Sequence, residues 1–461
     1  MNSQSKKMEL LGSTSIPKAL LAMGIPTMIG MLVNAFYNLV DAYFVSGLGE
    51  SQMGAISVVY PLGQVVVGLG LLFGNGAASY ISRLLGRGDK KNADKVASTA
   101  LYSSVSVGAV IIIISMVFLH PILKLLGATD SILPFAATYA GIYIVSCIFN
   151  VFNVTMNNIV TSEGAAKTTM CALLMGAALN IALDPLFIYV FDLGVAGAAI
   201  ATAISQIVST CVYLTYIFRK KSVFHFRVKD CTYTKETMSE IFKIGIPTLV
   251  FQILTSVSIS LINNAAGDYG DSAIAGMGVV TRLISMGSLS VFGFIKGFQP
   301  IAGYSYGAKK FDRLREAIKT SILWSTVFCV IFGVILALFP TAIVSQFTKG
   351  DSEMIRIGAA SLRANGISIM LFGFYTVYSS LFLALGKGRE GFILGACRQG
   401  ICFIPVILLL PMVWGLNGIM YAQPIADVLS AVITVFMAIP LHKKLNEMQK
   451  QTSAISTKDN D

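Results

Sequence analysis

Asn180-Ile181-Ala182-Leu183-Asp184-Pro185 lies late in an apolar segment that runs from about residue 165 to residue 191. A carboxylate inside a bilayer-length segment costs about 2.5–3.5 kcal/mol on insertion scales, so such a residue usually faces a cavity and has a function. Asn180 and Asp184 are four residues apart and point to the same side of a helix. Pro185 lacks an N–H and frees the carbonyl of Ile181. The stretch therefore predicts a membrane helix with an oxygen-rich face, suited to a proton or a small hard cation.

The composition is that of a membrane protein. Of the 461 residues, 55% are hydrophobic and only 12% are charged, whereas a soluble protein carries about 25% charged residues. The formal net charge of +11 is explained by basic loops, and no nucleic-acid partner is expected because the chain has no soluble basic domain. The seven cysteines and three histidines form no Cys-x-x-Cys pair, metal-ligand cluster or catalytic triad. We therefore expect no metal site, no catalytic residues and no enzyme activity.

Apolar segments long enough to cross a bilayer, which needs about 20 residues, recur along the whole chain. The twelve segments are 18–45, 54–84, 93–120, 131–161, 165–191, 194–218, 240–267, 273–304, 312–344, 352–385, 391–413 and 416–441. Lys and Arg are concentrated in alternate connections, around residues 83–91, 219–243, 309–319, 387–389 and 443–444. This bias places these connections and both termini in the cytoplasm.

The chain also repeats itself. Residues 23–28 (MGIPTM) match 244–249 (IGIPTL), residues 54–59 (GAISVV) match 275–280 (AGMGVV), and Gln206 falls on Asp427, always with the same offset. The fold class is therefore all-α, with two six-helix halves related by a pseudo-two-fold axis along the membrane normal and a cavity between them. The predicted boundaries are 1–14 for a cytoplasmic N-terminal tail, 15–218 for the N-terminal lobe, 219–239 for a cytoplasmic linker, 240–441 for the C-terminal lobe and 442–461 for a cytoplasmic C-terminal tail.

Several polar residues of the first half share one depth in the membrane. At 1.5 Å per residue, four side chains from four helices lie roughly 7–12 Å from the outer surface: Asp41, Tyr139, Asp184 and Thr202. Asn180 is one turn deeper, and Asn157 is nearer the cytoplasm. Polar groups of this kind can simply hold helices together, which is the simpler reading for Tyr139 or Thr202 alone. Two carboxylates without a basic partner raise one another's proton affinity, so Asp41 and Asp184 indicate a site operated by protons or Na⁺.

The second half carries different charges. Asp41 falls on Ile262 and Asp184 on Pro405 in the repeat, whereas Lys296, Arg398 and Asp427 lie within second-half segments. Either a structural ion-pair network or a role in gating and anionic-substrate contact would explain this C-lobe charge network. Pro26, inside the first segment, predicts either a fixed kink or a hinge coupled to protonation of Asp41.

These features resemble the multidrug and toxic compound extrusion (MATE) family, in its prokaryotic branch, over residues from about 15 to 445. The resemblance rests on the two halves of six spans, Gly24-Ile-Pro-Thr27, Asp41, residues 82–88 and Asn180-x-x-x-Asp184-Pro185. It implies that Asp41 and Asp184 carry the coupling cation, that Pro26 takes part in bending, and that a polar network completes the cation site: Asn180, Thr202, Tyr139 and Asn157. It further implies a drug pocket formed by Met31, Asn34, Tyr37, Asn153, Asn157 and Gln206.

The expected function is a multidrug efflux antiporter of the cell membrane, which exports organic cations and amphiphilic drugs in exchange for Na⁺ or H⁺. No cofactor is expected besides the coupling ion, and the expected partners are drug molecules and membrane lipids, with the protein a monomer. The alternative is a lipid-linked oligosaccharide flippase of the same superfamily, which Lys296, Arg363 and Arg398 keep open. A Gly-x-x-x-x-Gly-Lys-[Ser/Thr] loop is absent from the sequence, which argues against ATP hydrolysis by this chain.

Overall fold

The computed structural model describes residues 3–348 and 351–458, which contain helices and connecting turns but no strand. Twelve helices of the described chain are long and apolar enough to cross a membrane, which confirms the predicted all-α architecture. The first six spans are α2 (Ile16–Ser46), α3 (Glu50–Gly86), α4 (Lys90–Val117), α6 (Leu133–Ser162), α7 (Ala166–Pro185) with the π-helical η1 (Leu186–Val190), and α8 (Gly194–Phe218).

The second six spans repeat this order with more interruptions. They are α9 (Lys235–Gly267), α10 (Asp271–Gly307), α11 (Phe311–Leu338), α13 (Ser352–Ser368) continued by η4 (Ile369–Leu371) and α14 (Phe372–Ala384), α15 (Gly388–Ala396) continued by η5 (Cys397–Ile401) and α16 (Phe403–Trp414), and α17 (Leu416–Lys458). The short helices α5 (Leu119–Leu125) and α12 (Pro340–Val344) occupy the same place in the two halves, after the third span. The remaining short elements are α1 (Ser3–Gly12), η2 (Val228–Asp230) and η3 (Ser345–Phe347).

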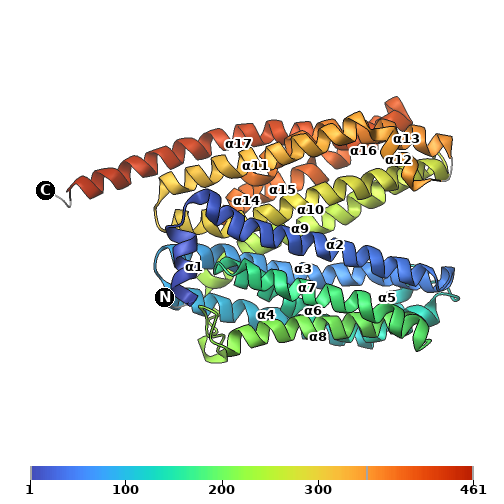
Figure 1. The fold of residues 1–461 in the computed structure, drawn as a ribbon, viewed down its shortest axis with the longest axis horizontal. Helices are drawn as coiled ribbons and strands as arrows, with labels where there is room; N and C mark the ends of the chain where they lie inside the picture. The colour runs from blue at the N-terminus through green and yellow to red at the C-terminus, as the bar shows by residue number, and fades with distance from the viewer. Residues whose placement is uncertain (1–2, 349–350, 459–461) are drawn as a thin grey trace.

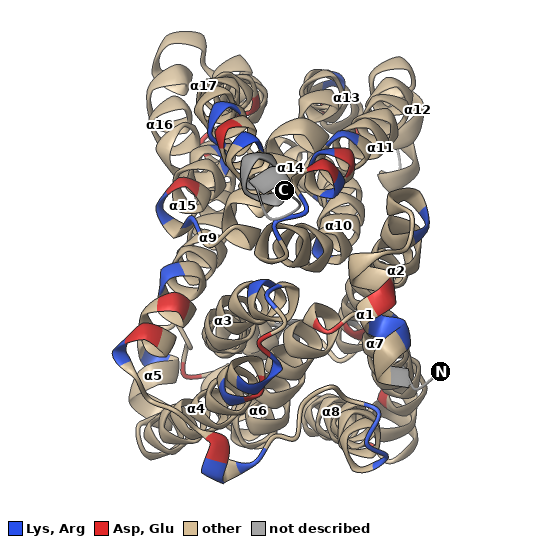
Figure 2. Ribbon diagram, turned by 90° about the vertical axis from the view of Figure 1, so that its left-hand side faces the viewer, with Lys and Arg blue, Asp and Glu red and all other residues tan. Residues whose placement is uncertain are grey.

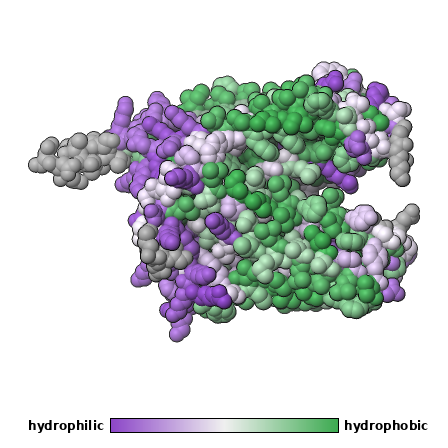
Figure 3. Space-filling view, viewed as in Figure 1, coloured by the Kyte–Doolittle hydropathy of each residue, from purple (hydrophilic) through white to green (hydrophobic). Residues whose placement is uncertain are grey.

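The two halves form two lobes that lie side by side along their length. In Figure 1 the blue-to-green part of the chain fills the lower half of the molecule and the yellow-to-red part fills the upper half. Both chain ends lie at the left-hand end, which we call the terminal end, and Figure 2, viewed from that end, shows the Lys and Arg positions that gather there. Figure 3 shows an apolar band between the two polar ends and a hollow between the lobes at the end opposite the termini.

The lobes meet through a few central helices. Helix α2 packs against α10, and α3 packs against α9 and α10. These contacts lie toward the terminal end, where a methyl group added at Gly245 would come within 2.1 Å of the Leu72 carbonyl oxygen. Close packing at this end and a hollow at the other mean that the cavity between the lobes opens away from the termini.

Three helices continue into segments predicted as tails or linker. Residues 3–12 form α1, whose Leu11 is fully buried in the hydrophobic core of the second lobe. Helix α9 begins at Lys235, within the predicted linker, because the Thr234 side chain caps it by accepting a hydrogen bond from the Thr237 N–H. Helix α17 runs on to Lys458, and Leu445, 1% exposed, still packs into the hydrophobic core of the second lobe. Hydropathy alone does not predict these extensions because each of them lies outside an apolar segment.

Candidate cation and substrate site

The two first-lobe carboxylates meet where α2 packs against α7. The side chains of Asp41 and Asp184 are close enough to interact directly. Asp184 is 0% exposed, and Asn180, one turn earlier on α7, donates a hydrogen bond from Nδ2 to Asp184 Oδ1 at 3.3 Å. This bond is the geometry that a four-residue spacing produces on a helix.

Three oxygen atoms at this place have no hydrogen-bond partner in the described chain: Asp41 Oδ1, Asp184 Oδ2 and Asn180 Oδ1. All three are buried, and a buried polar atom without a partner costs free energy unless an ion, a proton or water satisfies it. The ion pairs found among the described residues include neither carboxylate. The site is therefore a cluster of acceptor atoms, which suits a cation or a proton.

Two tyrosines accompany the carboxylate pair. Tyr37, on α2, lies near both carboxylates, and Tyr139, on α6, lies near Asp41. Tyr139 stacks on Tyr143 with ring centroids 5.5 Å apart, which holds its position. Thr202 is half-buried on α8, and no hydrogen bond links it to the carboxylates in the part of the chain that the structure describes.

The predicted drug-pocket residues fall into two groups. Asn153 on α6 donates to Gln206 Oε1 on α8 at 2.8 Å, and Thr210 donates to Asn153 Oδ1 at 2.9 Å. Met31 and Asn34 lie on α2 with Tyr37, and of these Asn34 is exposed. One group thus belongs to α2 and the other to the contact between α6 and α8.

A polar stripe along α6 adds a residue that the sequence reasoning missed. Asn150, Asn153 and Asn157 follow one another at helical spacing, and the buried Oδ1 of Asn150 has no hydrogen-bond partner in the described chain. The spacing i, i+3, i+7 of three asparagines in an apolar span is a signal that could have identified Asn150.

Asn157 joins a different network from the carboxylates. It donates from Nδ2 to the Tyr213 hydroxyl at 3.2 Å, and its Oδ1 accepts a hydrogen bond from the ammonium of Lys296. Lys296 lies on α10, so this hydrogen bond crosses from the second lobe to the first. Asn157 is therefore a contact between the lobes in this state of the protein.

The structure divides the predicted C-lobe charge network. Arg398, in η5, forms an ion pair with Asp427 on α17, with Nε and Oδ1 3.0 Å apart. Asp427 also accepts hydrogen bonds from the side chains of Ser368 (3.0 Å), Tyr375 (3.2 Å) and Gln423 (2.9 Å). Lys296 takes no part in this cluster because it points across the lobe boundary to Asn157. The grouping of all three charges in one network was therefore wrong.

The two lobes differ in how their buried carboxylates are satisfied. Asp427 occupies the repeat position of Gln206, and every hydrogen bond it accepts comes from its own lobe. Among the described residues, Asp184 accepts a hydrogen bond from Asn180 at 3.3 Å, and its Oδ2 has no hydrogen-bond partner. Asp427 is thus saturated by hydrogen bonds and an ion pair, whereas the first-lobe carboxylates keep acceptor atoms available to a cation or a proton.

We expect Arg398→Met to destabilise the protein strongly, because it leaves Asp427 buried without its counter-charge. Removing one partner of a buried ion pair typically costs about 3–5 kcal/mol. The double variant Arg398→Met/Asp427→Leu removes both charges and is expected to recover most of this loss. Thermal unfolding in detergent measures the effect, and equal destabilisation by the single and double variants would contradict it.

The comparisons with known proteins agree with this architecture. The MatE family model matches residues 26–186 and 247–409, one stretch in each lobe. The multidrug export protein MepA of Staphylococcus aureus (strain MSSA476) is 32% identical over 429 residues, covering 93% of this chain and 94% of that protein.

Solved structures of transporters have the same fold. The outward-facing conformation of a multidrug resistance MATE family transporter of the MOP superfamily superposes with a TM-score of 0.90 at 26% identity, covering 96% of this chain and 99% of that one. A MOP superfamily transporter from Pyrococcus furiosus Vc1 (DSM3638), whose binding pocket is reported to have reverse polarity, superposes with a TM-score of 0.88 at 26% identity and the same coverage. With a family model matched in both lobes and a relative aligned over nearly its whole length, the chain belongs to the MatE family of multi-pass membrane transporters.

Proposed function

We propose that this protein is a multidrug efflux antiporter that exports organic cations and amphiphilic drugs in exchange for Na⁺ or H⁺. The observation that carries the proposal is the set of three unpartnered oxygen atoms on Asp41, Asp184 and Asn180, buried in one lobe. A relative that is 32% identical over 93% of this chain is a multidrug export protein, which supports drugs as the substrate class.

The coupling ion is itself a transported substrate of the proposed antiporter. Carboxylate and amide oxygens are ligands for hard cations, so Asp41, Asp184 and Asn180 would hold Na⁺, with the Tyr37 hydroxyl close by. The same two carboxylates would instead share a proton, because two like charges in contact favour protonation of one of them. Both ions fit this donor set.

We assign the terminal end to the cytoplasm, because Lys and Arg cluster in its loops. The hollow between the lobes then opens to the outside, and the cytoplasmic end is closed. Two hydrogen bonds made by the repeat-related Thr27 and Thr248 cross the lobe boundary on the closed side: Thr27 donates to the Gly293 carbonyl at 2.6 Å, and Asn75 donates to the Thr248 hydroxyl at 2.8 Å. Lys296 and Asn157 add a third.

Ion binding and drug release are coupled through α2. Pro26 removes one backbone hydrogen bond from this helix, and Thr27 beside it is anchored to α10. Bending at Pro26 would move the segment that carries Asp41 while the closed end stays in place. An ion that binds more tightly in one state than the other shifts the population toward that state, and the electrochemical gradient of the ion supplies the free energy for transport.

Lys296 and Asn157 supply a prediction for the closed end. Either single variant, Lys296→Met or Asn157→Leu, removes the same hydrogen bond between the lobes, so their effects should be non-additive. We expect a coupling free energy within the usual range of about 0.5–3 kcal/mol for residues in contact. The measurement is a double-mutant cycle on the fraction of molecules open at the cytoplasmic end, read from distances between spin labels. Additive effects would mean that the bond does not hold the lobes together.

Drug flux in inverted membrane vesicles tests the proposed function. A Na⁺ gradient and a pH gradient are imposed separately, and accumulation of a fluorescent cationic drug is recorded. We expect accumulation under one gradient, which names the ion. If no cationic drug moves under either gradient, antiport is wrong, and movement of a lipid-linked oligosaccharide becomes the function to assay.

The flippase alternative requires a cationic central cavity, and the related transporter from Pyrococcus furiosus shows that pocket polarity can differ within the superfamily. In this chain the positive charge of Arg398 is balanced by Asp427. Lys296 is bonded to a neutral amide and adds a single positive charge at the lobe boundary. This balance favours the antiporter.

A further inference from the structure

Helix α1 connects the two lobes at the terminal end. It is not one of the membrane spans, and Figure 1 shows it crossing between the lower and upper halves of the molecule before the chain enters α2. Met8 packs against the hydrophobic cores of both lobes, and Leu11 is fully buried in the core of the second. A ten-residue helix in this position must detach from one lobe whenever the lobes separate at this end.

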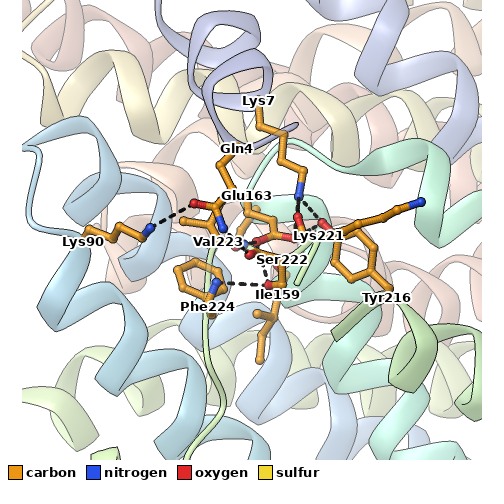
Figure 4. A network of polar contacts seen from close by, with 11 residues as sticks. Gln4, Lys7, Lys90, Ile159, Glu163, Tyr216, Lys221, Ser222, Val223 and Phe224 are labelled. Atoms are coloured by element: carbon orange, nitrogen blue, oxygen red, sulfur yellow. Dashed lines mark hydrogen bonds and ion pairs between the residues drawn. The ribbon is translucent and has the colours of Figure 1, made fainter. Parts of the chain in front are cut away.

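The contact of α1 with the first lobe is a buried ion pair. Lys7 lies 3.3 Å from Glu163 Oε1, and its ammonium also donates to the Lys221 carbonyl at 2.5 Å and to the Tyr216 hydroxyl (Figure 4). Burial lowers the pKa of Lys7, and the Glu163 carboxylate opposes this effect. Gln4, one turn earlier on α1, donates to the Ser222 carbonyl at 2.8 Å.

Glu163 is saturated by groups from the first lobe and the linker. It is 0% exposed, and it accepts hydrogen bonds from the Val223 N–H at 2.6 Å and the Ser222 hydroxyl at 3.0 Å, in addition to Tyr216 and Lys7. Removing Lys7 from this site would leave a buried carboxylate without its cation, which is strongly unfavourable. This contact is therefore expected to persist in every state of the transporter.

The contact of α1 with the second lobe is of a different kind. Arg313, on α11, donates to the Leu11 carbonyl at 3.1 Å and to the carbonyls of Leu10 and Thr14. Lys310, just before α11, donates to the Gly12 carbonyl at 2.8 Å. Three of these acceptors, on Leu10, Leu11 and Gly12, are the last carbonyls of α1, which have no partner within the helix and favour a nearby cation. Water can replace these bonds when the lobes part, because neither side leaves a buried charge behind.

We propose that α1 is a latch between the lobes: it stays on the first lobe through Lys7 and Glu163 and releases the second lobe at Arg313 and Lys310. While closed, the latch stabilises the state in which the terminal end is shut. The proposal rests on the alternating access described under the proposed function, but its direct readout is the distance between the lobes, which does not depend on the identity of the ion or the drug.

Arg313→Gln tests the strength of the latch. The variant removes a charge-assisted contact made only in the closed state, so the fraction of molecules open at the terminal end should rise roughly tenfold. Arg315→Gln is the matched control, because Arg315 lies on the same helix but donates to Asn446 on α17 and not to α1. Spin labels on the two lobes at the terminal end report the fraction. Equal fractions in the Arg313 and Arg315 variants would overturn the proposal.

Reversible cross-links test which contact opens. A thiol-cleavable cross-linker joins the pair Leu10→Cys/Arg313→Cys in one protein and the pair Gln4→Cys/Ser222→Cys in another. The first link ties α1 to the second lobe and should hold the terminal end closed and stop drug transport until it is reduced. The second link ties α1 to the first lobe and should change neither the opening of the terminal end nor drug transport.

The outcomes separate the latch from the transport function. If both links block opening of the terminal end, α1 must also move relative to the first lobe. If neither link blocks opening, the terminal end opens without the release of α1. Either result overturns the latch. If the unlinked protein moves no drug under any gradient, the proposed function is wrong. The spin-label distances still test the latch in that case, because they do not depend on drug transport.

Discussion

Asp184→Asn is expected to reduce ion-driven drug accumulation strongly while leaving the protein folded. The substitution keeps the shape of the side chain and the hydrogen bond with Asn180 within reach, but removes the negative charge that holds a cation. Coupling between two ligands of a transporter is typically worth about 1–3 kcal/mol, or roughly 5–150-fold. We expect accumulation in inverted vesicles to fall by a factor in that range, and Asp41→Asn to behave in the same way.

Thermal stability provides the control for folding. Replacing one of two adjacent carboxylates with an amide relieves their repulsion, so the unfolding temperature of Asp184→Asn should equal or exceed that of the unmodified protein. If Na⁺ is the ion, it should raise the unfolding temperature of the unmodified protein and not that of the variant, because only a bound ligand stabilises by mass action. Asp268→Asn, an exposed position between α9 and α10, is the matched control and should transport normally.

Normal coupled transport by both Asp184→Asn and Asp41→Asn would contradict the cation site. In that event the unpartnered oxygens would be satisfied by water alone. A loss of transport accompanied by a lower unfolding temperature would instead assign the carboxylates a structural role. Only the combination of lost coupling and retained stability supports the proposed site.

The first-lobe carboxylates could be brought together from the sequence because two simple rules were enough. The distribution of Lys and Arg orients the spans, and the rise per residue of a helix then gives the depth of each side chain. The same reasoning assigns Thr202 the same depth, yet the structure shows no hydrogen bond from Thr202 to Asp41 or Asp184 among the described residues. Depth along a helix does not specify rotation about its axis, and rotation decides which side chains meet.

Contacts between the lobes could not be predicted from the sequence. Lys296 was grouped with Arg398 and Asp427 because all three are charges in second-half spans, but its partner Asn157 belongs to the other half. Likewise, nothing in the polar residues 3–12 indicates that Lys7 has a buried partner, because the Glu163 site is assembled from segments more than fifty residues apart in the chain. Hydropathy and repeats describe each lobe separately and carry no information on how the lobes dock.

A second large effect is expected at the glycines that line the closed end. We define the glycine seam as three repeat-related pairs on the central helices: Gly24 and Gly245, Gly76 and Gly297, Gly86 and Gly307. A methyl group at Gly307 would lie 2.1 Å from the Arg83 carbonyl oxygen, and one at Gly76 would lie 2.2 Å from the Ile241 carbonyl oxygen, in each case across the lobe boundary. The lobes can therefore close only while these positions lack a Cβ.

We expect Gly307→Ala to shift the protein toward the state that is open at the terminal end. Overpacking a tight contact costs typically about 1–3 kcal/mol, and here the cost applies only to the closed state. Alanine is also more favourable than glycine within a helix by about 1 kcal/mol. This gain in free energy is the same in the open and closed states, so it cancels. The ratio of open to closed molecules should thus rise roughly 5–150-fold, and drug efflux should fall because the outward-open state becomes scarce.

Gly278→Ala is the matched control on the same helix, α10, because an added methyl group there has no neighbouring atom within 4 Å. It should transport as the unmodified protein does. Gly245→Ala, whose methyl group would meet the Leu72 carbonyl oxygen at 2.1 Å, should reproduce the effect of Gly307→Ala, because it overpacks a second contact with α3, this time from α9. Distances between spin labels on the two lobes are the measurement. If Gly307→Ala and Gly278→Ala give the same distances and the same flux, the seam is not the contact that closes the transporter, and the close approach of α3 to α10 has no part in alternating access.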